Sequence, residues 1–144
     1  MSYVMNHNVR DGIPTFELHG TKSVENSREI WSRLQAHIET NKLGRLLVID
    51  EMIDDLTVWD VVDIETFLTV SDFARGVRVA IVDRALRNER NSNAFGELYL
   101  LNRGWYRIKM FENRDLALAW LRSDEKSARR YHWTPCEDPG ECDA

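Results

Sequence analysis

Two apolar, β-branched runs lie in the second half of the chain: Val77-Arg78-Val79-Ala80-Ile81-Val82 and Tyr106-Arg107-Ile108-Lys109-Met110-Phe111. Each run passes directly into a helical pattern, and the pattern after the second is Asn113-Arg114-Asp115-Leu116-Ala117-Leu118-Ala119-Trp120-Leu121. A strand that leads into a helix, and does so twice, is typical of βα units laid on one sheet. These stretches predict an α/β fold in which the later strands are parallel and joined by right-handed crossovers.

The first half of the chain predicts more strands and a helix ahead of these units. Residues 2–9 and 13–19 are short strand-like runs separated by Arg10-Asp11-Gly12, a turn signal that predicts an antiparallel hairpin. Residues 23–41 carry apolar side chains at helical spacing, and Ser23 is placed to cap that helix. The continuous apolar run at residues 46–49 predicts a strand that is covered on both faces.

Three more helices complete the expected fold. One begins at Thr57, which has the spacing of a capping box with Asp60, and ends at Arg75-Gly76. Its expected core stripe is Trp59, Val62, Phe67, Val70 and Phe73. Another helix runs through residues 95–102, and the last is capped by Asn113. We therefore predict a mixed, mostly parallel five-stranded sheet with an N-terminal antiparallel hairpin and four helices.

The length and composition fit one domain. A chain of 144 residues can bury a core of its own, and the periodicity fades after Ser123. We expect an α/β domain over residues 1–122 and a largely irregular tail over 123–144. The net charge of −5 disfavours nucleic acid or an anionic membrane as a partner. No stretch approaches the roughly 18 apolar residues of a membrane span, and no secretory signal opens the chain, so we expect a cytoplasmic protein.

Several segments carry a family resemblance: Gly20 ahead of the first helix, Leu46-Leu47-Val48-Ile49-Asp50, Arg78-Val79-Ala80-Ile81-Val82-Asp83, Met110-Phe111 and Ala117-Leu118-Ala119-Trp120-Leu121. Together, over residues 1–122, they resemble the SpoIIAA-like proteins, a group related to STAS domains. The resemblance implies a single SpoIIAA/STAS-like domain of a bacterial cytoplasmic protein without established chemistry. It also implies a fold used elsewhere for protein–protein regulation and, in relatives of the Sec14 type, for holding apolar ligands.

Regulatory STAS proteins carry a phosphorylatable serine where the strand equivalent to residues 46–49 meets the next helix. The only hydroxyl between residues 50 and 60 of this chain is that of Thr57. A phosphate there would add negative charge beside Asp54, Asp55 and Asp60. We therefore interpret Thr57 as a helix cap rather than as a phosphorylation switch.

The sequence contains no paired acid and base or activated nucleophile, so we predict a protein that is not an enzyme and uses no cofactor. The acids between residues 50 and 65 occur without an intervening base. They favour a solvated loop over a metal site, because no glycine-punctuated calcium loop is present. His132, Cys136 and Cys142 lack a fourth zinc ligand, and a solvated tail is the preferred interpretation.

Basic residues, among them Arg84 and Arg87, follow the strand at residues 77–82. In a parallel sheet this loop leaves the same edge as the acidic loop, so the two are expected to face each other. Mutual neutralisation is the preferred interpretation. The other is an anion or acidic-partner site, to which Asn88, Asn91 and Ser92 at the next helix N-terminus would add donors.

Two functions remain open. The first is a non-catalytic interaction or regulatory module, whose loops at residues 54–60 and 84–91 contact another protein or a second copy of the chain. The second is a carrier or sensor of a small apolar, lipid-like ligand held between the second and third helices. The residues that we expect to line that ligand site are Trp59, Phe67, Phe95 and Tyr99.

Overall fold

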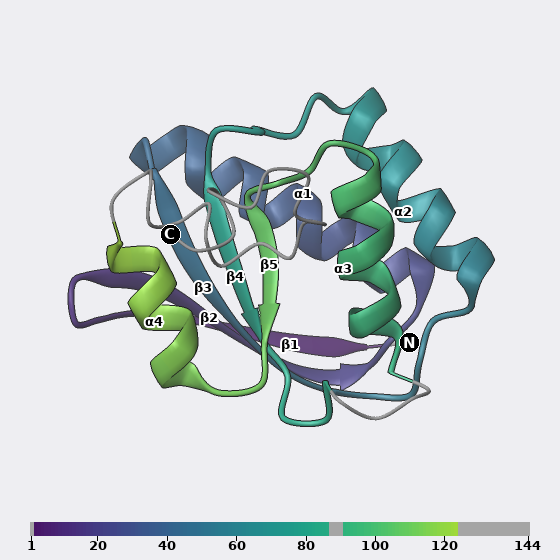
Figure 1. The fold of residues 1–144 in the computed structure, drawn as a ribbon, viewed down its shortest axis with the longest axis horizontal. Coiled ribbons are helices and arrows are strands. Elements are labelled where there is room, and N and C mark those ends of the chain that lie inside the picture. The colour runs from purple at the N-terminus through teal and green to yellow at the C-terminus, as the bar shows by residue number, and fades with distance from the viewer. Residues whose placement is uncertain (1, 87–90, 124–144) are drawn as a thin grey trace, which may run out of the picture.

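A computed structural model describes residues 2–86 and 91–123. These described residues form nine elements in this order (Figure 1): β1 (Tyr3–Arg10), β2 (Ile13–Thr21), α1 (Val24–Asn41), β3 (Arg45–Ile53), α2 (Val58–Val70), β4 (Arg78–Val82), α3 (Ser92–Asn102), β5 (Ile108–Phe111) and α4 (Arg114–Arg122). The elements make one five-stranded sheet in the order β1-β2-β3-β4-β5. Strands β1 and β2 pair antiparallel, and every other pair is parallel, which confirms the predicted α/β fold.

The N-terminal hairpin turns through Asp11 and Gly12, as predicted. Both residues have positive φ, at 54° and 77°. Two such residues form the tight turn whose twist matches that of paired strands. Arg10 consequently pairs with Ile13 at the end of the ladder.

The helix caps expected from the sequence are present. The Ser23 hydroxyl accepts a hydrogen bond of 3.0 Å from the backbone N–H of Asn26, and Asn113 accepts one of 2.9 Å from Leu116. Thr57 and Asp60 form the reciprocal bonds of a capping box, at 3.0 and 3.1 Å. These contacts satisfy first-turn donors that the helices themselves leave unpaired.

Two element boundaries differ from the prediction. Strand β3 continues beyond residues 46–49, because Asp50 and Glu51 keep the parallel register with β2 despite their charge. Helix α2 stops at Val70 instead of at Arg75-Gly76. Its end is a Schellman motif, in which Asp72 has a φ of 55° and the N–H of Phe73 bonds to the carbonyl of Leu68 at 3.0 Å.

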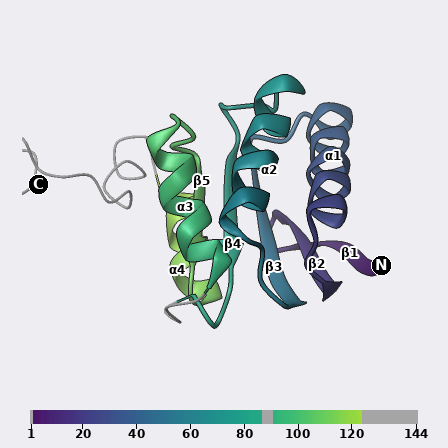
Figure 2. The same ribbon diagram turned by 90° about the vertical axis from the view of Figure 1, so that its right-hand side faces the viewer.

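The helices cover both faces of the sheet. One buried cluster joins α1, α2 and α3 to the sheet, and a second joins α4 to the opposite face. In Figure 1, α4 lies to the left of the sheet, and α2 and α3 lie to the right. Figure 2 shows α1 beside β1 and β2 and α3 near β5, so that the helices follow the order of the strands.

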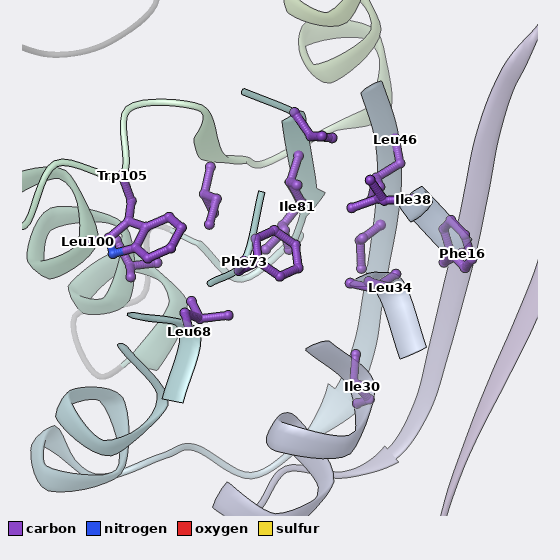
Figure 3. Close-up of a cluster of buried hydrophobic side chains, with 14 of the residues drawn as sticks. Phe16, Ile30, Leu34, Ile38, Leu46, Leu68, Phe73, Ile81, Leu100 and Trp105 are labelled. Atoms are coloured by element: carbon purple, nitrogen blue, oxygen red, sulfur yellow. The ribbon is translucent and has the colours of Figure 1, made fainter. Parts of the chain in front are cut away.

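The larger cluster is organised around aromatic rings. Figure 3 shows Phe73 between Trp105 on one side and Leu34 on the other. The ring of Phe73 meets that of Trp31 edge-on at 5.2 Å and that of Trp105 at 6.3 Å. Trp105, which the sequence pattern did not place, is 2% exposed and belongs to this core.

The predicted core stripe of α2 is wrong at two positions. Trp59 and Val70 are both 80% exposed, whereas the buried positions of the helix include Val61, Ile64 and Leu68. Apolar residues occur on both sides of α2, so helical spacing alone did not distinguish the buried face from the exposed one.

Candidate functional site

A cavity of about 90 Å³ lies between the sheet and helices α1, α2 and α3. Its wall includes one apolar side chain from each of six elements: Leu18, Leu34, Val48, Ile64, Ile81 and Leu100. All six are buried. The inner wall of the space therefore belongs to the main core.

The lining becomes more exposed toward one side. Ser27 and Trp31 on α1, Met52 in β3 and Leu56 in the segment after β3 also line the cavity, and all four are half-buried. The cavity thus approaches the surface between α1 and the connection from β3 to α2. A ligand entering from that side would meet apolar side chains first.

A buried ion pair lies at the polar end of the cavity. The Nζ of Lys22 is 3.5 Å from Oδ2 of Asp50, and each side chain is 8% exposed. Lys22 directly follows β2, and its backbone N–H bonds to the carbonyl of Ile53 at 2.9 Å. This bond fixes the start of the lysine side chain against the end of β3.

Amide side chains at the start of α3 join this pair to a second carboxylate. The Nδ2 of Asn93 donates to Asp50 at 2.7 Å and to Asp83 at 2.9 Å. Asn91, the N-cap of α3, donates to Asp83 at 2.8 Å. The two carboxylates are neighbours because β3 and β4 are parallel and Ile49 is in register with Val82. We call Lys22, Asp50, Asp83, Asn91 and Asn93 the polar network.

Asp83 is ionised more easily than an ordinary carboxyl. Burial by itself would raise the pKa of Asp83, but hydrogen bonds from Asn91, the backbone N–H of Ala85 and Asn93 outweigh burial and lower it. The positive charge of Lys22 acts in the same direction. The network therefore holds Asp83 as a carboxylate although only 8% of the residue is exposed.

We expect Asp83→Asn to destabilise the protein at neutral pH by about 1–3 kcal/mol, because charge-assisted hydrogen bonds are lost. The pKa of Asp83 is lower in the folded protein than in the unfolded chain, so its contribution to stability is complete above the unfolded-state pKa. That contribution is lost as the pH falls through the folded-state pKa. The gap between wild type and variant should shrink as the pH falls below about 4. Urea denaturation across that range measures it, and a gap independent of pH would contradict the role given to Asp83.

The structure does not bring the predicted ligand-lining residues to the cavity. Trp59 is exposed on the outside of α2, and Phe67 lies beneath Arg28, whose guanidinium is 5.9 Å from the ring centre. Phe95 and Tyr99 pair with each other on α3, with ring centres 6.0 Å apart. None of these four side chains lines the cavity.

The two charged loops meet as the sequence predicted. Arg84 and Glu51 approach to 3.8 Å, but the arginine side chain is 86% exposed, so the pair is weak. Ser92 donates to Asp55 through its backbone N–H at 3.2 Å and its hydroxyl at 3.3 Å. The Ser92 donors at the N-terminus of α3 and the side-chain amide of Asn91 therefore bond to carboxylates of this chain, Asp55 and Asp83. Arg87 and Asn88 lie outside the described residues.

The sequence suggested two possible metal sites, one at the acids of residues 50–65 and one in the C-terminal tail. Within residues 2–86 and 91–123, no group of three or more His, Cys, Asp or Glu side chains is arranged to hold a metal ion. His132, Cys136 and Cys142 lie outside the described residues. Thr57 caps α2 as predicted, and the expectation that it is not a phosphorylation switch stays a prediction.

Sequence reasoning did not assign Lys22, Asn93 or Gly96 to a site, although all three line the cavity. A signal for the polar network was nevertheless present. Lys22 comes directly after a strand, and Asp50 and Asp83 each follow an apolar run. Parallel strands bring such residues to one edge of the sheet.

Comparison with known proteins finds similarity among solved structures. No protein-family model matches the chain, and no curated protein matches it. Among solved structures, the chain is similar to an uncharacterized protein from the DUF3478 family with a SpoIIAA-like fold, from Shewanella loihica PV-4. The two chains are 19% identical with a TM-score of 0.45, and the match covers 83% of this chain and 93% of the other. That description names the fold type which the sequence resembles.

Within the described part of the chain, no helix combines the length and the apolar character that crossing a bilayer requires.

Proposed function

We propose that this protein is a non-catalytic module that holds a small apolar ligand in the cavity beneath α1, α2 and α3. The observation that carries the proposal is an apolar space of about 90 Å³ in the main core with an ion pair at one end. An apolar ligand in this space would remove the apolar wall from water, which is favourable. The proposal retains the expectation of a bacterial cytoplasmic protein.

The volume limits the ligand. An apolar cavity of about 150 Å³ holds one benzene molecule. The present cavity is smaller and suits a group of a few carbon atoms, either a small molecule or the apolar end of a longer one. A longer ligand would extend outward past Trp31 and Met52, where the wall is half-buried.

The polar end favours an uncharged ligand with an acceptor oxygen. Lys22 has three N–H donors, and Asp50 is the only ion-pair partner it has among the described residues. The carboxylates of Asp50 and Asp83 already accept hydrogen bonds from backbone and amide groups. Because two carboxylates surround one ammonium, an anionic ligand would be repelled, whereas a carbonyl or hydroxyl oxygen would not.

Gly96→Leu is the variant that tests the proposal. Gly96 lines the cavity, and a Cβ at this position would meet no atom within 4 Å. We expect leucine to fill the space and to stabilise α3 by about 1 kcal/mol through its better helix propensity. Xenon is the probe, and methyl NMR of Leu34, Val48 and Ile81 is the measurement. Xenon should shift these methyl signals in wild type and should not shift them in Gly96→Leu.

Ala94→Leu is the matched control, since it adds the same side chain to an exposed position of α3. It should leave the xenon-induced shifts unchanged. Wild-type methyl signals that do not respond to xenon, or that respond equally in Gly96→Leu, would contradict ligand binding in this cavity.

A protein-interaction role, the other function predicted from the sequence, is favoured by a separate observation, the exposed apolar face of α2.

A further inference from the structure

Helix α2 carries a mostly apolar stripe on its outer side. Trp59, Val62, Thr66 and Val70 follow one another at intervals of three and four residues, which places them on one side of the helix. Trp59 and Val70 are each 80% exposed, and Val62 is half-buried. In Figure 2, α2 lies at the front of the molecule. We call these four residues the α2 stripe.

Two more exposed apolar side chains lie just before the stripe in the sequence. Val58, at the start of α2, is 56% exposed, and Ile53, at the end of β3, is 64% exposed. Single apolar residues on a surface are ordinary, but a contiguous apolar patch with a polar rim marks an interaction site. The exposed tryptophan is the residue type that most often dominates binding energy at such sites.

The rim of the stripe is acidic. Residues 46–74, which include the whole of α2, contain no lysine or arginine. Asp63 pairs with Arg28 from α1 at 2.5 Å, and so is neutralised. Asp54, before α2, and Asp72, after it, are exposed and form no ion pair within the part of the chain that the structure describes. The two ends of the stripe therefore carry uncompensated negative charge.

We propose that the α2 stripe is a docking surface for a basic amphipathic helix of a partner protein. The apolar face of such a helix packs on Trp59, Val62 and Val70, while its lysine or arginine side chains reach the carboxylates of Asp54 and Asp72. A second copy of this chain would bring two acidic rims together, and an anionic membrane would meet the same repulsion. Charge complementarity therefore selects the basic partner.

The test uses the full chain and a designed helix made only of leucine and lysine in an amphipathic pattern. We expect this peptide to bind wild type, to shift the amide NMR signals of Val58, Trp59 and Val70, and to bind less tightly as salt is added. Trp59→Ala should weaken binding at least tenfold. Leu98→Ala, which truncates a 52% exposed residue on α3, should leave binding unchanged.

A charge variant separates the acidic rim from the apolar stripe. Asp54 and Asp72 have positive φ, at 67° and 55°, a conformation that asparagine tolerates well. Asp54→Asn combined with Asp72→Asn should therefore keep the fold and weaken binding of the leucine–lysine peptide severalfold. A peptide of leucine and glutamate in the same pattern should not bind.

Several results would overturn the docking proposal. They are no binding of the leucine–lysine peptide to wild type, equal binding to Trp59→Ala, and equal binding of the leucine–glutamate peptide. Self-association of the chain that is lost in Trp59→Ala would instead assign the stripe to a second copy. Binding to phosphatidylcholine vesicles through the same residues would assign it to a membrane.

Discussion

Replacing Trp120 by alanine is expected to lower the free energy of unfolding by about 3–5 kcal/mol, a large part of the stability of a domain of this size. Trp120 is 0% exposed and fills the space between α4 and the sheet, where its ring lies 5.7 Å from that of Phe111. Alanine would leave a cavity in the smaller of the two cores. Urea denaturation followed by far-UV circular dichroism measures the loss.

Trp59→Ala is the matched control for this variant, because Trp59 is 80% exposed. We expect it to change the free energy of unfolding by no more than about 0.5 kcal/mol. Equal losses for the two variants would contradict the placement of α4 on the sheet and of Trp59 on the surface.

Asp50→Ala is expected to cost about 3–5 kcal/mol of stability, because it removes the ion-pair partner of the buried Lys22 ammonium. The Oδ2 of Asp50 also accepts the 2.7 Å hydrogen bond from Asn93, so the first turn of α3 would lose one attachment to the sheet. Thermal and urea denaturation at neutral pH measure this loss.

Glu51→Ala provides the comparison within the same strand. Its pair with Arg84 is long, at 3.8 Å, and the two side chains are 38% and 86% exposed. Exposed pairs of this kind contribute about 0–1 kcal/mol. If the two neighbouring variants proved equally mild, the polar network would not stabilise the end of the cavity as described here.

Local chemistry predicted much of the fold. Asp11 and Gly12 supply the two positive φ angles of a hairpin turn, and Ser23 and Thr57 cap helices at the expected positions. Such features depend on a few adjacent residues. The parallel pairing of the later strands followed from the βα order, because the crossovers leave little freedom of direction.

The features that the sequence could not predict depend on residues far apart in the chain. Trp59 was expected in the core because α2 has apolar residues on both sides, and only contact with α1, α3 and the sheet determines which side is buried. Gly96 lines the cavity together with Leu34 and Val48 and contributes no side chain that could fill it. A gap of this kind is a mismatch of volumes in three dimensions and leaves no periodic pattern.

The burial of Lys22 is another feature that depends on residues far apart in the chain. Its position after a strand was visible, but its burial depends on Asp50, which the prediction placed in a solvated loop. Strand β3 is longer than its apolar run, and the added residues carry Asp50 into the sheet.

Native mass spectrometry of the purified protein tests the central claim, that the core cavity holds a ligand, most directly. We expect wild type and Ala94→Leu to retain the same non-covalently bound small molecule and Gly96→Leu to lose it. Circular dichroism should show that all three proteins are folded. Retention of that molecule by Gly96→Leu, or the absence of any bound molecule from wild type, would contradict the claim.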